Sequence, residues 1–140
     1  MRADPAVNTP SKISRFAAAA LCFILPFALA WFFGRLVVAY WDYFDMGVSG
    51  ARGFVMLIGY MPFAIIVFLA LGTASHFSMR GCGFGPWLSL TVGVAAMLVA
   101  LLCGFGYEVY RLRGYPIAAE NQHTMGEFIV WFIRSFFHKT

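Results

Sequence analysis

The side chains that could carry chemistry are few in this chain and lie far apart. Three cysteines and three histidines are scattered along it: Cys22, Cys82, Cys103, His76, His123 and His138. None of them has the CxxC or Cys/His spacing of a metal site. The sequence also lacks the GxSxG, HExxH and Walker motifs and any paired catalytic carboxylates. We therefore expect no enzyme activity, no metal and no cofactor.

Arg35 and Glu108 are the candidates for an ion pair inside a membrane. Arg35 lies six residues before Trp41, which is roughly 9 Å deeper than that aromatic boundary if the segment is helical. A charge at the bilayer centre costs about 2.5–3.5 kcal/mol on insertion scales, so Arg35 should seek a partner. If the first and third apolar segments both cross the membrane, Glu108 lies on the same side as Arg35. We predict an Arg35–Glu108 pair; the alternative is that Arg35 extends to the lipid headgroups.

A stripe of small residues follows the third apolar segment. Its members are Ser89, Gly93, Ala96, Ala100 and Gly104. Spacings of four, three, four and four place them on one face of a helix. Small residues let two backbones approach closely in lipid. The stripe therefore predicts a packing face, which either contacts the other spans of this chain or receives a partner subunit.

Composition explains why these residues must be positioned by membrane-spanning helices. Of the 140 residues, 61% are hydrophobic and 11% are charged, whereas soluble domains are about a quarter charged. A soluble chain of this length buries only about 70% of its unfolded surface, so it could not hide this much apolar surface. Three uncharged runs cover residues 16–34, 53–75 and 81–107. Each is long enough, or nearly so, to cross a bilayer as a helix.

The predicted fold is an all-α polytopic membrane protein, organised as a single membrane domain over residues 1–140. The predicted segments are a polar tail at 1–15, transmembrane helices at 16–41, 53–75 and 86–107, and an amphipathic interfacial helix at 124–138. The alternative for the last segment is a tail that faces water and packs on the protein. The alternative for the first is a cleavable signal peptide ending at Ala28-Leu29-Ala30, although the apolar run continues beyond that triplet.

Local signals mark the ends of these segments. Pro26 and Pro62 are expected to kink the first and second spans. The glycine-rich stretch His76–Gly85 is predicted to be the turn between the second and third spans. Thr124 and Glu127 match a capping box, in which the two side chains satisfy free amides at a helix start.

Basic residues give an orientation. With three spans, Arg2, Lys12, Arg15 and Arg80 lie on one side, and Arg35, Arg52, Arg111, Arg113, Arg134 and Lys139 lie on the other. The six-to-four excess favours a cytoplasmic C-terminus. Because the spans are closely spaced and no Asn-x-Ser/Thr site occurs, we expect a bacterial inner membrane. The basic residues do not form an aromatic-lined stripe, so we expect lipid contact and no binding of nucleic acid.

The absence of catalytic motifs favours a non-enzymatic role. We predict a small membrane protein that binds a membrane partner, either as an accessory subunit of a larger complex or as a protective factor against a membrane-acting toxin. A homo-oligomer is the other partner that we consider. The alternatives are a self-assembling, holin-like pore-former and a small transport component.

Overall fold

The computed structural model describes residues 11–44, 53–112 and 124–137. The elements are, in chain order, α1 (Lys12–Tyr43), η1 (Met56–Tyr60), α3 (Met61–Gly81), α4 (Pro86–Leu112) and α6 (Met125–Phe137). No strand occurs in the described ranges. η1 and α3 belong to one helical stretch, Gly53–Gly81, and this stretch, α1 and α4 are each long and apolar enough to cross a membrane. The predicted all-α class with three spans and a short C-terminal helix is confirmed.

α1 is the longest element, and a side-chain cap marks its start. The Ser11 hydroxyl accepts a hydrogen bond from the backbone N–H of Ser14 at 3.2 Å, which satisfies one of the free amides of the first turn. Pro26 is buried inside the helix, which continues through it to Tyr43. The 32 residues of α1 extend for about 48 Å at about 1.5 Å per residue. A bilayer with its headgroups is about 40–45 Å thick, so both ends of α1 reach the polar zone.

η1 is a π-helical turn, and Pro62 explains its position. The Met61 N–H bonds to the carbonyl of Met56, five residues earlier. Pro62 has no N–H to bond the carbonyl of Ile58, and its ring would clash there in a regular α-helix. The wider turn removes this conflict and ends at Tyr60. The irregularity expected at Pro62 is therefore a π turn.

The connection from α3 to α4 is a tight helix C-cap. Gly83 has a φ of 86°, a left-handed conformation that glycine adopts at little cost. Its N–H bonds to the carbonyl of Arg80, and the N–H of Phe84 bonds to the carbonyl of Met79, both at 3.1 Å. These two bonds form a Schellman motif, which ends α3 and reverses the chain into α4.

The predicted turn over His76–Gly85 is too long. α3 continues to Gly81 and α4 begins at Pro86, so only the second half of that stretch is a turn. The glycine-rich sequence predicted the end of the helix too early in the chain. Gly81 is tolerated in the last turn of α3, and the left-handed residue that ends the helix is Gly83. His76 consequently lies in the helix, where it is buried.

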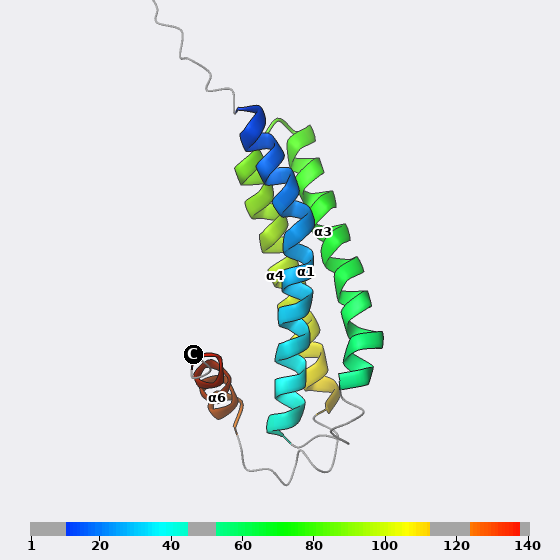
Figure 1. Cartoon of the computed structure of the whole chain (residues 1–140), viewed down its shortest axis with the longest axis vertical. Coiled ribbons are helices and arrows are strands. Elements are labelled where there is room, and N and C mark those ends of the chain that lie inside the picture. Colours follow the sequence, from blue (N-terminus) through cyan, green and yellow to red (C-terminus); the bar gives the residue numbers. More distant parts are fainter. Residues whose placement is uncertain (1–10, 45–52, 113–123, 138–140) are drawn as a thin grey trace, which may run out of the picture.

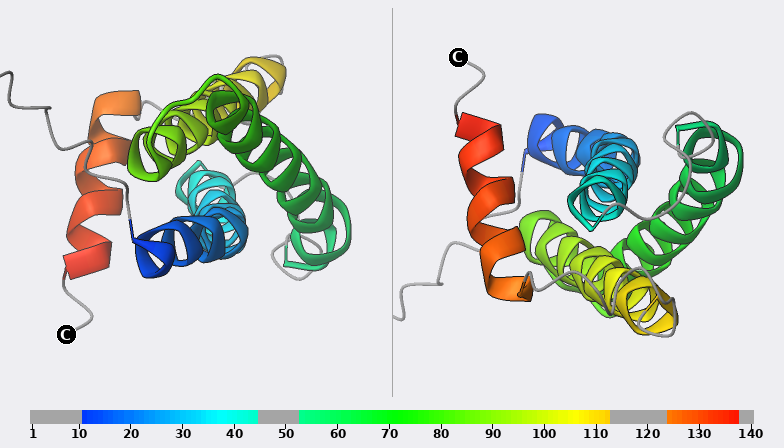
Figure 2. Two further views of the ribbon diagram at one scale, coloured as in Figure 1. Left: turned by 90° about the horizontal axis from the view of Figure 1, so that it is seen from above. Right: turned by 90° about the horizontal axis from the view of Figure 1, so that it is seen from below.

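The three spans form a triangular bundle in which each contacts the other two. In Figure 1 α1, α3 and α4 run side by side along the long axis of the molecule, and the end-on views of Figure 2 place them at the corners of a triangle. The core between them contains the buried side chains of Val37, Phe68, Met97 and Leu101. α1 and α4 both run toward the end where α6 lies, and the η1–α3 stretch begins there.

α6 lies across the bundle and not along it (Figures 1 and 2). Its capping box is confirmed: the N–H of Glu127 bonds to the Thr124 hydroxyl at 3.3 Å, and the N–H of Thr124 bonds to the Glu127 carboxylate at 2.8 Å. Phe128 is 1% exposed and packs on Tyr40 of α1 and Phe105 of α4. Trp131 and Phe132 also pack on α1, against Tyr43 and Phe32. A helix that crosses the spans and packs on them through one aromatic face has the geometry of an interfacial helix.

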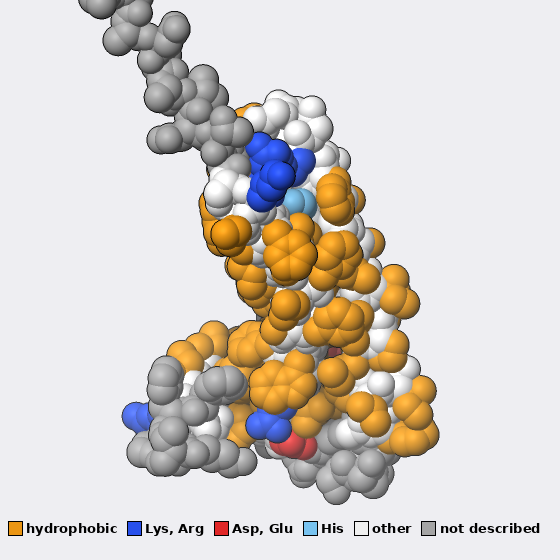
Figure 3. Space-filling model, turned by 45° about the horizontal axis from the view of Figure 1, so that its top comes forward, with side chains coloured by type: hydrophobic (Ala, Val, Ile, Leu, Met, Phe, Trp, Pro, Cys, Tyr) orange, Lys and Arg blue, Asp and Glu red, His pale blue; other side chains and the backbone are white. Residues whose placement is uncertain are grey.

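The surface is apolar along the spans and charged near their ends. Figure 3 shows apolar side chains over the length of the visible face, with Lys and Arg gathered at the two ends. This distribution matches a hydrocarbon layer with polar zones on both sides.

Candidate functional site

Glu108 is the centre of a polar cluster that joins all three spans. Its side chain is 1% exposed and accepts hydrogen bonds from the indole N–H of Trp41 at 3.0 Å and from the hydroxyl of Tyr60 at 2.9 Å. Arg111 donates from Nε at 3.1 Å to one carboxylate oxygen and from a terminal nitrogen at 2.7 Å to the other. We call Trp41, Tyr60, Glu108 and Arg111 the Glu108 cluster. It links the end of α1, the π turn η1 and the last turns of α4.

The carboxylate of Glu108 is fully used by these contacts. An ionised carboxylate offers about four acceptor positions, and Glu108 receives four hydrogen bonds. The two-pronged contact from Arg111 is the strongest geometry available to such a pair. A general base or proton relay needs a free lone pair facing its substrate. The arrangement therefore fixes helices together and leaves no acceptor for acid–base chemistry.

Local structure explains how each partner reaches Glu108. Tyr60 is the last residue of the π turn, which changes the angular position of this side chain relative to a regular helix. Arg111 lies three residues after Glu108 on α4, a spacing that places two side chains on one helix face. Of the four members, only Glu108 was predicted as a site residue. The Glu108–Arg111 spacing was the signal in the sequence that could have identified the true ion pair.

The predicted Arg35–Glu108 pair is wrong. Glu108 pairs with Arg111 at 2.7 Å, whereas the Arg35 side chain is exposed and its guanidinium lies 5.8 Å from the ring centre of Trp31. Trp41 does face Glu108, and Arg35 precedes it by six residues, which is about 120° around the helix. Arg35 therefore lies on a different face of α1 from Trp41, and it points away from Glu108.

The small-residue stripe of α4 packs largely within the chain. A Cβ atom added at Gly93 would lie 3.0 Å from the backbone oxygen of Gly72 on α3, and one added at Gly104 would lie 3.5 Å from the ring of Phe33 on α1. Ser89 is buried and donates to the carbonyl of Gly85 at 2.9 Å. Ala96 and Ala100 are half-buried. Of the two readings of the stripe, these contacts favour packing between the chain's own spans.

A cavity of about 200 Å³ lies beside the Glu108 cluster, between α3 and α4. Its lining is Phe33, Tyr60, Phe63, Ala64, Val67, Phe68, Ala100, Gly104, Tyr107 and Glu108. The small side chains at Ala100 and Gly104 leave this space open. The cavity is open to the surface of the spans, and apart from Tyr60, Tyr107 and Glu108 its lining side chains are apolar.

The remaining ionisable residues do not assemble a reactive centre in the described part of the chain. His76 is 4% exposed, its ring packs on Phe77, and its Nδ1 has no partner. Among the described residues, no group of three potential metal ligands occurs. His123 and His138 lie outside the described residues.

Comparison of the chain with protein-family models, with curated proteins and with solved structures finds no match.

Proposed function

We propose that this chain is a non-enzymatic integral membrane protein that acts by binding another membrane protein. The observation that supports this most directly is that the spans keep the central carboxylate inside the bundle and expose apolar side chains on the outside. The Glu108 cluster turns the central carboxylate inward and satisfies it. Only 17–28% of the most apolar part of each span is buried within the chain. Most of the span surface is therefore available to lipid or to a partner.

The exposed surface is rich in large aromatic side chains. Those exposed on the spans are Phe16, Phe23, Phe27, Trp31, Phe54, Phe63, Phe77, Trp87, Tyr107 and Tyr110. Aromatic rings bury a large area with few rotatable bonds and are enriched at protein interfaces. This surface supports a binding role.

The polar groups favour binding over solute transport. Transporters place ionisable groups along a pathway at mid-membrane depth. Here Glu108 lies close to the end of α4, is saturated, and borders an apolar cavity. A role as an accessory subunit of a membrane complex, or as a protective factor against a membrane-acting toxin, requires no such pathway. We propose a cytoplasmic C-terminus on the distribution of basic residues. We propose a bacterial inner membrane because the spans are closely spaced and the sequence has no Asn-x-Ser/Thr site.

Site-specific photocrosslinking in native membranes tests this proposal. A photoreactive phenylalanine analogue is placed singly at Phe27, Phe63 and Leu102, which are exposed on α1, α3 and α4, and at the buried Phe68 as a matched control. We expect one discrete heterologous protein adduct from one or two adjacent faces and none from Phe68. The adduct should co-elute stoichiometrically with the chain in mild detergent.

Two outcomes would overturn the proposal. Adducts at multiples of the chain's own mass, together with a conductance in planar bilayers, would indicate a self-assembling pore. Adducts with lipid alone at all three exposed positions, with a monomer in mild detergent, would show that the span surface has no protein partner.

A further inference from the structure

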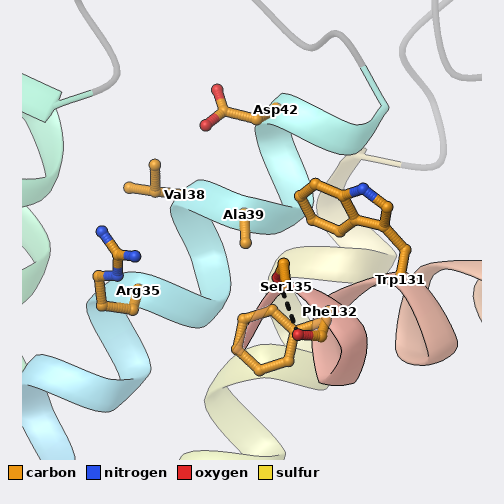
Figure 4. A pocket seen from close by; sticks show the side chains of 7 residues that line it. All are labelled: Arg35, Val38, Ala39, Asp42, Trp131, Phe132 and Ser135. Atoms are coloured by element: carbon orange, nitrogen blue, oxygen red, sulfur yellow. Dashed lines mark hydrogen bonds between the residues drawn. The ribbon is translucent and has the colours of Figure 1, made fainter. Parts of the chain in front are cut away.

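A second cavity, of about 360 Å³, lies between α1 and α6. Its lining is Arg35, Val38, Ala39, Asp42, Trp131, Phe132 and Ser135. In Figure 4 the side chains of Arg35, Val38 and Asp42 project to the same side of α1, and Trp131 and Phe132 come from α6. The cavity therefore carries one cation and one anion, with apolar side chains beside them.

The position of Arg35 along α1 places it at the edge of the hydrocarbon layer. Arg15 and Arg35 are the first and last charged residues around the uncharged run of α1 and are twenty residues apart. At about 1.5 Å per residue they are about 30 Å apart, which equals the thickness of the hydrocarbon core. Asp42 lies about 10 Å further toward water. α6 lies across this end of α1 and forms the other wall (Figure 1).

The side chain of Arg35 is exposed, and its guanidinium N–H groups can donate further hydrogen bonds. Within the described ranges its one recorded interaction is with the Trp31 ring, 5.8 Å from the ring centre. A ring face accepts none of the directed hydrogen bonds that five guanidinium N–H groups can donate. Asp42 takes part in another interaction, but a carboxylate has about four acceptor positions and can receive a further donor.

We propose that this cavity binds the headgroup of phosphatidylethanolamine, with the phosphate on Arg35 and the ammonium group on Asp42. The order of charges agrees, because the phosphate of this lipid lies next to the glycerol and its ammonium group lies further out. Val38 and Ala39 lie between Arg35 and Asp42 along α1 and line the space for the two ethanolamine carbons. The proposal does not depend on the function proposed above.

Charge complementarity selects this lipid over other common ones. Phosphatidylglycerol brings a phosphate but no cation, so Asp42 would oppose its binding. Phosphatidylcholine brings a quaternary ammonium group that has no N–H to donate. Phosphatidylethanolamine offers each of the two charged side chains a charge-assisted hydrogen bond, which is stronger than a neutral one.

Native mass spectrometry of the delipidated full chain tests the proposal. Phosphatidylethanolamine, phosphatidylglycerol and phosphatidylcholine with identical acyl chains are titrated separately. We expect phosphatidylethanolamine to bind about tenfold more tightly than either of the others, as the loss of one charge-assisted bond implies. Arg35→Gln should remove that tight binding, and Arg35→Lys should restore part of it. Asp42→Asn should lower the affinity for phosphatidylethanolamine to that for phosphatidylcholine.

The matched control is Arg15→Gln, which removes an exposed cation at the opposite boundary and should leave the lipid preference unchanged. Arg35 and Asp42 are both exposed, so the variants should fold, and circular dichroism verifies this. Equal or tighter binding of phosphatidylglycerol would show a simple anion site and overturn the proposal. An equal loss in Arg15→Gln and Arg35→Gln, or no lipid preference in the natural chain, would overturn it as well.

Discussion

At the scale of single residues, the Glu108 cluster shows how a carboxylate can be kept near a membrane span. Removing a carboxylate from water is repaid only when the partner geometry is excellent and the remaining acceptor positions are satisfied. Arg111 supplies the two-pronged contact, and Trp41 and Tyr60 supply donors from two other segments. The side chain of Arg111 is 45% exposed, so its guanidinium also reaches the headgroup zone. The cluster thus lets the polar end of α4 bind α1 and η1.

A double-mutant cycle on Glu108 and Arg111 should measure this interaction. We expect Glu108→Gln and Arg111→Gln each to destabilise the bundle, and their combination to cost less than the sum by about 1–3 kcal/mol, because the two residues share one network. The measurement is the free energy of unfolding by SDS titration in mixed micelles.

The control cycle combines Glu108→Gln with Arg35→Gln. Since Arg35 points outward and lacks contact with Glu108, the two effects should add to within about 0.3–0.5 kcal/mol. Coupling between Arg35 and Glu108, together with none between Arg111 and Glu108, would contradict the geometry.

At the scale of elements, α3 and α4 owe their close approach to two glycines. Gly93 faces the backbone of Gly72, and a Cβ at either position would meet a neighbour at 3.0 Å. At Gly93 that neighbour is a backbone oxygen, which cannot move without shifting α3. At Gly72 it is the sulfur of Met97, an adaptable side chain. Gly93 is therefore the position where the helix–helix distance is set.

Gly93→Ala should destabilise the bundle by roughly 1–2 kcal/mol. Overpacking costs about 1–3 kcal/mol, and the better helix propensity of alanine returns at most about 1 kcal/mol. The matched control is Gly106→Ala on the same helix, where nothing lies within 4 Å of the added Cβ; it should be neutral or stabilising. The same SDS titration compares both variants, and equal effects would rule out a special role for Gly93.

α6 is held to the bundle by aromatic rings, of which Phe128 is the most deeply buried. Phe128 packs among Tyr40 and Tyr43 of α1, its C-cap residue Phe44, and Phe105 of α4. Trp131 and Phe132 add contacts with Tyr43 and Phe32 of α1. Its neighbours Ile129, Val130 and Ile133 are about half exposed, so they face lipid. α6 thus combines features of both predictions for this segment, because one face packs on the protein while the other face suits the membrane interface.

Phe128→Ala should release α6 from the bundle. Truncating a buried phenylalanine costs about 3–5 kcal/mol, which exceeds what a short helix gains from its cap. Hydrogen–deuterium exchange should show faster exchange over Met125–Phe137, with the spans unaffected. Ile129→Ala, a change of an exposed neighbour on the same helix, is the control. Unchanged protection in Phe128→Ala would mean that lipid alone orders α6.

At the scale of the whole molecule, the three-span arrangement separates two polar ends. Trp87 donates to the Ser14 hydroxyl at 2.9 Å, which joins the start of α4 to the start of α1. The Glu108 cluster joins the same two helices, with η1, at the other end. Polar contacts therefore fasten the bundle at both ends, and apolar packing fills the length between them. This division suits a molecule whose middle is surrounded by lipid.

The natural cysteines report the orientation of the protein. Cys82 is exposed in the α3–α4 turn, Cys22 is buried, and Cys103 is exposed on the surface of α4, about two thirds along the helix. If the C-terminus is cytoplasmic, a membrane-impermeant maleimide should label Cys82 in intact cells, and Cys82→Ser should abolish the labelling. Cys103 should resist it because lipid covers it. Labelling that requires permeabilised cells would reverse the orientation.

The sequence by itself determined the helical class, the three spans and the capping box of α6. These follow from uncharged runs that must satisfy their backbone internally in lipid, and from hydrogen bonds between residues three apart in the chain. The element ends were less predictable: α3 continues six residues beyond the predicted end of its span, because the polar residues after Ser75 are compatible with a helix and the left-handed residue that reverses the chain is Gly83.

Only the tertiary structure decided which residues meet. Depth along a helix predicted that Arg35 and Glu108 share a membrane side, but rotation about the helix axis turned Arg35 outward and Trp41 inward. The π turn at Tyr60 added a donor whose angular position cannot be read from a regular helical repeat. Side-chain pairing depends on rotation and crossing angle as well as on depth, and these are fixed only when three helices pack around one core.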